Sequence, residues 1–176
     1  MRFSRRLMAT SLCLLLVCSV PAMAETKVEL TNVHLCCGAC VSAANKILKG
    51  VEGVTGACDQ NGKKITFTAL DDATAQKALD ALAAGGFHGV TASKTLAMKD
   101  DSGATPGKVS KLKVAAIHNC CPACTRDIKK ALKKVDGVKE DTAAPRKNSF
   151  EVTGDFDAAQ VIKALNEAGY HAKVEK

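Results

Sequence analysis

Apolar and polar residues follow the same order of patterns twice along the chain. Near the start of each copy, Val28 and Leu30, and later Leu112 and Val114, alternate with polar residues, as in a half-buried strand. The apolar positions that come next are three and four residues apart, which predicts a helix with one buried face, starting near residues 39 and 123. These positions are Ala44, Ile47, Leu48 and Val51 in the first copy, and Ile128, Ala131, Leu132 and Val135 in the second.

A hairpin and a second helix are predicted after the first helix. Asn61-Gly62 is a signal for a two-residue hairpin turn. Asp71 or Asp72 can cap the second helix, and Asp157 can do so in the second copy. A short last strand completes the order strand, helix, strand, strand, helix, strand. This order predicts an α+β chain of two tandem ferredoxin-like βαββαβ sandwiches.

The domain boundaries follow from the repeat and from a polar segment between the copies. We expect a first domain at 25–96, a linker at 97–110 that is rich in turn residues, and a second domain at 111–176. The two domains are expected to fold independently, and nothing in the pattern requires them to pack together.

The N-terminal segment has the pattern of a secretory signal peptide. Three arginines among the first six residues precede an apolar run at 7–20, and Ala22-Met23-Ala24 then forms an A-x-A cleavage site. The apolar run is short for a membrane span. We therefore expect residues 1–24 to be removed, with no transmembrane segment left, and the protein to be exported to the periplasm or secreted.

Composition excludes some classes of function. The net charge of +7 includes the three arginines of the leader, so the remaining chain is only mildly basic. With five Phe, one Tyr and no Trp, the chain lacks the aromatic platforms of a single-strand nucleic-acid binder, and we expect no nucleic-acid partner. Of nine cysteines, Cys13 and Cys18 lie in the leader. The remaining seven form an odd number with adjacent pairs, which is a poor disulfide framework.

Six of the remaining cysteines form two copies of one motif, His-x-Cys-Cys-x-x-Cys. The candidate metal ligands are His34, Cys36, Cys37, Cys40, His118, Cys120, Cys121 and Cys124. Two cysteines on the first helical turn direct their sulfurs toward one point, and the helix N-terminus favours the thiolate. Soft thiolates select Cu(I), Zn(II) or heavier soft ions, and the added cysteine and histidine can raise the donor number to four.

The sequence gives weaker support for a metal-site role of three further residues. His88 and His171 are equivalent in the two copies and are expected at the metal end, where each is either a supporting group or a ligand. Cys58 has no counterpart and is interpreted as a small residue in a strand.

The fold order and the Cys-x-x-Cys position resemble the heavy-metal-associated domain family. Cys37 and Cys40, and Cys121 and Cys124, take the places of the two family cysteines. Leu35 stands where the family has a buried methionine, whereas Asn119 departs from that pattern, which suggests different packing of the second loop. The histidines replace the usual glycine of the family motif. The extra cysteines Cys36 and Cys120 are similar to a Cys-Cys variant in plant zinc-pumping ATPases.

The resemblance implies a non-enzymatic metal carrier. We expect an exported protein that sequesters or transfers a soft ion, with about one Cu(I) or Zn(II) per domain. A metal-transporting membrane protein or another metallochaperone is the expected partner. A basic helix face at Arg126, Lys129, Lys130, Lys133 and Lys134 could dock it. The alternative is a thiol-disulfide oxidoreductase that uses the two Cys-x-x-Cys pairs, although thioredoxin-like folds need a longer βαβ layout.

Overall fold

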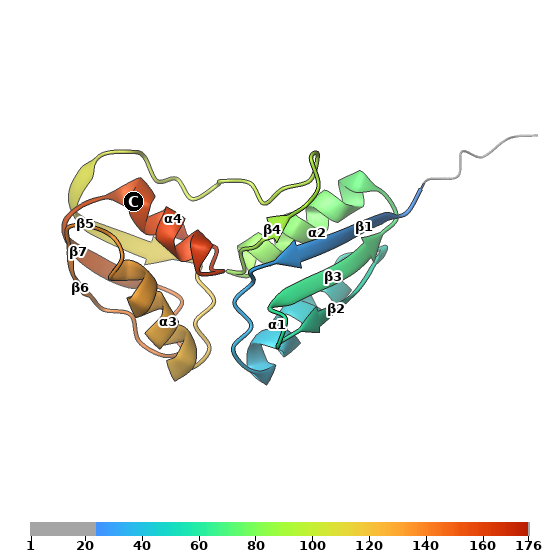
Figure 1. The fold of residues 1–176 in the computed structure, drawn as a ribbon, viewed down its shortest axis with the longest axis horizontal. Coiled ribbons are helices and arrows are strands. Elements are labelled where there is room, and N and C mark those ends of the chain that lie inside the picture. Colours follow the sequence, from blue (N-terminus) through green and yellow to red (C-terminus); the bar gives the residue numbers. More distant parts are fainter. Residues whose placement is uncertain (1–23, 176) are drawn as a thin grey trace, which may run out of the picture.

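The computed structural model describes residues 24–175, which form two similar α+β units side by side (Figure 1). The expected signal peptide at 1–24 therefore lies outside the described residues, apart from Ala24. None of the helices in the described part of the chain has both the length and the apolar character needed to cross a bilayer.

Each unit has the expected order of elements. The first contains β1 (Thr26–Thr31), α1 (Gly38–Lys49), β2 (Val54–Asp59), β3 (Lys64–Ala69), α2 (Asp72–Ala84) and β4 (Val90–Thr91). The second contains β5 (Lys108–Ala115), α3 (Pro122–Leu132), β6 (Val138–Asp141), β7 (Phe150–Asp157), α4 (Ala158–Glu167) and β8 (Lys173–Glu175). The two antiparallel sheets have the strand orders β2-β3-β1-β4 and β6-β7-β5-β8. Both units are therefore ferredoxin-like βαββαβ sandwiches, as predicted.

The cores of both units lie between sheet and helices at the positions that the apolar pattern indicates. Val28 and Leu30 are buried and pair with Phe67 and Ile65 of the central neighbour β3. Buried side chains on α1 and α2 cover the same face of the sheet. β5 begins at Lys108, so the second sheet includes three residues that the sequence analysis assigned to the linker.

One turn differs from its prediction. Asp59 pairs with Lys64, so four residues connect β2 and β3 and not only Asn61-Gly62. The side chain of Asp59 explains the longer turn, because its Oδ1 accepts hydrogen bonds from the amides of Asn61 and Gly62, each at 3.0 Å. The carboxylate therefore takes the place of the strand partner that these two amides would otherwise need.

The caps of the second helices agree with the sequence. Asp71, not Asp72, is the N-cap of α2 and accepts a 2.6 Å hydrogen bond from the amide of Thr74. Asp157 is the N-cap of α4 and accepts from the amides of Ala159 and Gln160. A short polar side chain at this position satisfies amides that have no partner within the helix.

The C-terminal ends of α2 and α4 position the residues that join the two units. At the end of α2 the amide of Gly86 donates to Ala83 and that of Phe87 donates to Leu82, which is a Schellman motif. Gly86 adopts a φ of 82°, in the left-handed region that favours glycine. The equivalent turn after α4 has Gly169 at a φ of 88° and is followed by Tyr170. The same type of cap therefore places an aromatic residue, Phe87 or Tyr170, directly after each helix.

The two units contact each other at these turns, although the sequence pattern did not require them to pack together. The carbonyl of Gly169 accepts from the amides of His34 and His88, at 3.3 and 3.0 Å, and the amide of His171 donates to Gly86 at 3.1 Å. Phe87 and Tyr170 form an antiparallel bridge across the same contact. Whether each unit also folds alone stays a prediction.

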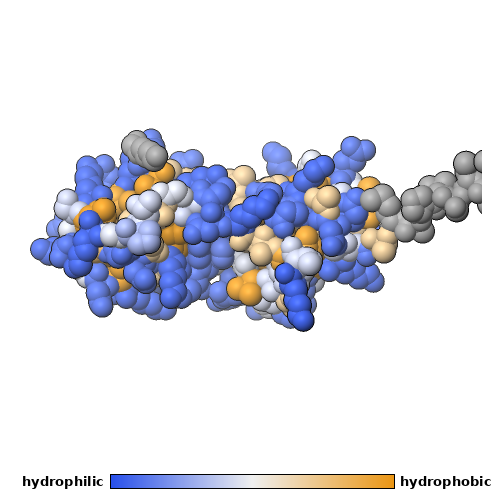
Figure 2. Space-filling model, turned by 90° about the horizontal axis from the view of Figure 1, so that it is seen from above, coloured by the Kyte–Doolittle hydropathy of each residue, from blue (hydrophilic) through white to orange (hydrophobic). Residues whose placement is uncertain are grey.

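The surface outside this contact is mainly polar. Figure 2 shows a hydrophilic surface with separate apolar patches on both units. Leu70 and Val90 are the large hydrophobic residues with high exposure in the described part of the chain, at 56% and 58%. Isolated apolar residues of this kind are normal on a folded domain.

Candidate metal centre

Two equivalent loops carry the predicted motif residues, one before α1 and one before α3. The backbone bends at Asn32 and Ala116, which adopt positive φ values of 59° and 58°, shortly before each motif. Cys37 and Cys121 are the N-caps of the two helices. The next motif cysteine in each copy therefore lies in the first turn of its helix, facing inward.

Burial separates the six cysteines into an inner pair and an outer set. Cys40 and Cys124 have no exposed surface, whereas the other four motif cysteines are half-buried. All seven described cysteines are free thiols. Cys58, the seventh, lies in β2 opposite Ile65 and belongs to none of the groups of potential ligands, as its interpretation as a small strand residue requires.

The contact between the units joins the two motifs into one cluster of thiols. Within each motif the sulfurs are 3.6–3.7 Å apart, as between Cys37 and Cys40 at 3.7 Å. Sulfurs of different units are equally close, and the Cys36–Cys124 distance is 3.4 Å. The inner pair Cys40 and Cys124 is separated by 3.9 Å. The structure therefore shows one thiol cluster in place of two separate sites.

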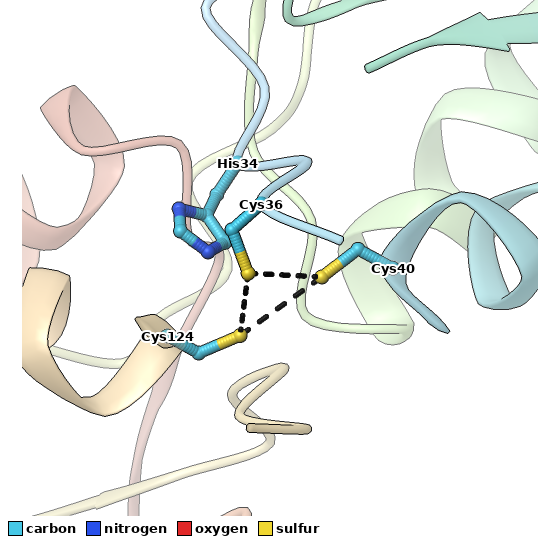
Figure 3. Close-up of side chains that lie close together, drawn as sticks. All are labelled: His34, Cys36, Cys40 and Cys124. Atoms are coloured by element: carbon cyan, nitrogen blue, oxygen red, sulfur yellow. Dashed lines mark hydrogen bonds between the residues drawn. The ribbon is translucent and has the colours of Figure 1, made fainter. Parts of the chain in front are cut away.

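His34 belongs to this cluster. Figure 3 shows His34, Cys36 and Cys40 of the first unit converging on Cys124 of the second. The potential ligand atoms of these four residues all lie within 4.8 Å of one another. On the far side of the ring, Nδ1 is 3.6 Å from a carboxylate oxygen of Asp127, and buried Nε2 has no hydrogen-bond partner. A carboxylate behind one ring nitrogen orients the other nitrogen toward a metal ion.

His118 occupies the equivalent place in the second unit but does not join the thiol cluster. Its Nε2 is also buried without a hydrogen-bond partner, but the residue is not part of any group of converging donors among the described residues. Its ring stacks on Phe87 of the first unit, with centroids 4.4 Å apart. The ring of His34 stacks in the same way on Tyr170 of the second unit at 4.2 Å. Each motif histidine is thus covered by the other unit's aromatic residue.

His88 and His171 lie beside the contact and form a pair with each other. Their Nδ1 atoms are 3.4 Å apart, and Nε2 of His171 is 2.7 Å from a carboxylate oxygen of Asp101. Burial, followed by the neighbouring His171, lowers the pKa of His88 to about 4. Neither residue joins the groups of converging thiols, so the structure favours a supporting role over a role as ligand.

Proton binding in the cluster is uneven because neighbouring thiols cannot all ionise together. The nearby backbone amide of Cys40, at the start of α1, lowers the pKa of the Cys37 thiol to about 7. A hydrogen bond from the Cys40 thiol lowers the pKa of Cys124, while the same contact raises the pKa of Cys40. Burial raises the pKa of Cys36, and raises the pKa of Cys120 to about 12. A cation that binds here must displace protons from the high-pKa thiols.

The sequence places the motif residues and the two Gly-aromatic-His segments at the metal end, but the contacts of Phe87, Tyr170 and Asp127 were not predicted from it. Phe87 and Tyr170 cover the histidines, and the Tyr170 hydroxyl donates a 3.1 Å hydrogen bond to the carbonyl of Cys124. Asp127, behind His34, lies in the basic helix face and was not singled out. The repeated Gly-aromatic-His segment was the available signal, because few aromatic residues occur in the chain.

Asn119 makes the different packing that its polar side chain suggested. It is buried, donates to the carbonyl of Ala144 at 2.8 Å and accepts from the Thr125 hydroxyl at 2.8 Å. Leu35, its equivalent in the first unit, packs in the core with 2% exposure.

Residues of the second unit are similar to a known domain family. The sequence profile of the heavy-metal-associated domain matches residues 112–171. Heavy metal-associated isoprenylated plant protein 34 of Arabidopsis thaliana is 35% identical over 61 residues, which cover 35% of this chain and 11% of that protein. The chain thus matches only a small part of that relative's length.

Two solved structures resemble single units. The copper binding domain from HMA7, a P-type ATPase, is 24% identical, with a TM-score of 0.36 over 39% of this chain and 96% of that domain. Oxidized MerP from Ralstonia metallidurans is 27% identical, with a TM-score of 0.33 over 40% of this chain and all of that protein.

Proposed function

We propose that this protein binds soft metal ions and sequesters them or passes them on, because residues 112–171 match the heavy-metal-associated domain family. The first unit repeats the fold order and the cysteine spacing of the matched unit. The observation that carries the proposal is the convergence of six free thiols and His34 at the contact between the units. Thiolate sulfur with imidazole nitrogen is a donor set for Cu(I) or Zn(II) and not for Mg²⁺ or Ca²⁺.

The cargo would be held by thiolate exchange, without a catalysed reaction. Four of the six motif cysteines are half-buried, so an incoming ion can reach outer thiols before the buried pair Cys40 and Cys124. A stepwise exchange of thiolate ligands lets an ion pass to a partner without being released into water. The ion would leave by the reverse order of exchanges.

Competition for the metal tests this proposal directly. Reduced protein should withdraw Cu(I) from a chromogenic chelator, and should withdraw Zn(II) from a zinc indicator in a separate titration. Cys58→Ser is the matched control, because Cys58 lies outside the thiol groups and its loss should leave binding intact. The proposal would be refuted if the reduced protein withdrew neither Cu(I) nor Zn(II) from its competitor.

The alternative function, thiol-disulfide exchange, needs one pair of cysteines to react without interference. In the structure each motif pair has equally close neighbours in the other unit, such as Cys36 and Cys121 at 3.5 Å. Oxidation would therefore give mixed pairings. An insulin-reduction assay of metal-free protein distinguishes the two functions, and a metal carrier is expected to be inactive in it.

We propose that the protein works outside the cytoplasm, in the periplasm or as a secreted protein. Support comes from the leader pattern of residues 1–24. N-terminal sequencing of the protein from a periplasmic or culture-medium fraction should begin at Glu25. Recovery of the uncleaved chain from the cytoplasm alone would contradict export.

The partner proposed for the second unit is an acidic surface on a metal-transporting membrane protein or another metallochaperone. The basic helix face is partly neutralised within the chain, because Lys129 pairs with Asp141 at 2.5 Å and Lys130 lies 3.6 Å from Asp127. Arg126, Lys133 and Lys134 are exposed at the same face. Charge complementarity there would accelerate encounter more than it would tighten binding.

A further inference from the structure

We infer that the six clustered cysteines form a single cage for four Cu(I) ions, shared by the two units; this inference rests on the proposed soft-metal function. A separate two-cysteine site in each unit would hold one ion without help from the other motif. The structure instead places sulfurs of the two units as close to each other as sulfurs of one motif. The number of ions follows from how these sulfurs are connected.

The six sulfurs divide into four triples. These are Cys36, Cys40 and Cys124; Cys36, Cys37 and Cys121; Cys37, Cys40 and Cys120; and Cys120, Cys121 and Cys124. Within every triple the sulfurs lie within 4.8 Å of one another. Each cysteine belongs to two triples, and any two triples share one cysteine. This is the connectivity of a cage in which four metal ions each bind three thiolates and each thiolate bridges two ions.

The distances fit metal–thiolate bonds. In the triple formed by Cys37, Cys40 and Cys120 the sulfurs are 3.7, 3.7 and 3.5 Å apart. The centre of such a triangle is about 2.1 Å from each sulfur, close to a metal–thiolate bond of about 2.3 Å. The triple with Cys36, Cys40 and Cys124 has sides of 3.7, 3.4 and 3.9 Å and gives a similar centre. An ion can therefore bind at these centres with little movement of the chain.

The number of donors favours Cu(I) over Zn(II). Zn(II) in a structural site is almost always tetrahedral and needs four ligands. Among the described residues, only the triple of Cys36, Cys40 and Cys124 gains a fourth donor, from His34. The other three triples offer three sulfurs each, which suits trigonal Cu(I). Zinc would fill one site and leave most of the cluster unused.

The surroundings favour the charge of the cage. Six thiolates around four monovalent ions carry a net negative charge. The N-termini of α1 and α3 both meet the cluster, because Cys37 and Cys121 are their N-caps. Neither cap side chain makes the usual hydrogen bond to its own helix. The positive ends of two helix dipoles thus face the thiolates and stabilise them.

Native mass spectrometry during an anaerobic Cu(I) titration of reduced residues 25–176 tests the inference. The expected result is a species with four Cu(I) ions that forms cooperatively, with little of the one- and two-copper species. X-ray absorption of the loaded protein should show three sulfurs per copper and a short copper–copper path. Cys124→Ser removes a member of two triples and should abolish the four-copper species. Cys58→Ser, outside the triples, should retain it.

Each other outcome has a definite meaning. Stepwise loading that stops at two ions, one per motif, would overturn the shared cage and leave soft-metal binding intact. A single ion held by His34, Cys36, Cys40 and Cys124 would also overturn the cage alone. Loading of four ions that survives Cys124→Ser would refute the connectivity. Absence of Cu(I) binding would overturn the cage, and it would overturn the proposed function as well only if the protein also failed to bind Zn(II).

Discussion

Replacing Gly169 by alanine is expected to loosen the contact between the two units while both stay folded. Gly169 has a φ of 88°, and a Cβ on it would meet two backbone atoms of the first unit, the His34 nitrogen at 2.4 Å and the Asn32 oxygen at 2.7 Å. Backbone atoms cannot move aside by a change of rotamer. The units must therefore shift apart at this point.

The expected magnitude follows from the hydrogen bonds at Gly169. Its carbonyl accepts from the amides of His34 and His88, and both bonds connect the units. Each such bond contributes about 0.5–1.5 kcal/mol, so losing both costs about 2 kcal/mol. This corresponds to about a thirtyfold increase in the fraction of molecules with an open contact, since about 1.4 kcal/mol is a factor of ten.

Amide hydrogen exchange measures this opening at the two donors. In Gly169→Ala, the amides of His34 and His88 should exchange about thirtyfold faster than in the unchanged protein, for the hydrogen-bond loss given above. Amides of β7, in the core of the second unit, serve as the internal reference for unfolding. The matched control is Gly103→Ala, since Gly103 has a φ of 71° but a Cβ added to it would meet no atom within 4 Å. Equal acceleration in both variants would show that backbone strain, and not the lost contact, is responsible.

Three further predictions concern the same region. Phe87→Ala, at a residue with 1% exposure, should lower the free energy of unfolding by about 3 kcal/mol or more in urea denaturation. Val90→Ala, at an exposed residue, should change it little, and equal losses in the two variants would contradict the buried packing of Phe87. Asp127→Asn should weaken Zn(II) binding about tenfold in indicator competition, because it removes the negative charge behind His34. An unchanged affinity would refute a supporting role for Asp127. Burial holds the pKa of His88 at about 4, below its unfolded value near 6.5, so the free energy of unfolding should fall as the pH drops from 6.5 to 4, by at most about 1.4 kcal/mol per pH unit. His88→Gln should flatten this pH dependence in urea titrations, and an unchanged slope would refute the role of His88.

Local patterns in the sequence predicted the fold of each unit well. The alternation at Val28 and Leu30 and the helical spacing of Ala44 and Leu48 describe contacts inside one unit, where period and burial are directly linked. The cap at Asp157 is equally local. The turn between β2 and β3 was predicted with two residues and has four. The Asp59 carboxylate stabilises the longer turn, because it accepts hydrogen bonds from the amides of Asn61 and Gly62.

The arrangement of the candidate site could be predicted only in part. The motif identified six cysteines and two histidines, and the antiparallel last strand correctly placed His88 and His171 near the metal end. The contact between the units was missed because it depends on backbone groups, such as the carbonyl of Gly169, that every residue possesses. Hydrophobic periodicity carries no information about such contacts. The two motif histidines therefore looked equivalent, although within residues 24–175 His34 has a carboxylate behind its ring and His118 has none.

The covalent connection between the units has a consequence for how the protein responds to dilution. Two separate chains would have to meet before their thiols could share an ion, so loading would depend on the square of their concentration. Here the segment between β4 and β5 tethers one motif to the other, and it is itself fixed near β8, where Val174 donates to the Ser102 carbonyl at 2.7 Å. The second motif is then always present at a high effective concentration. A single molecule can present both motifs to one ion at any protein concentration, which would suit the proposed soft-metal function where protein and metal are both scarce.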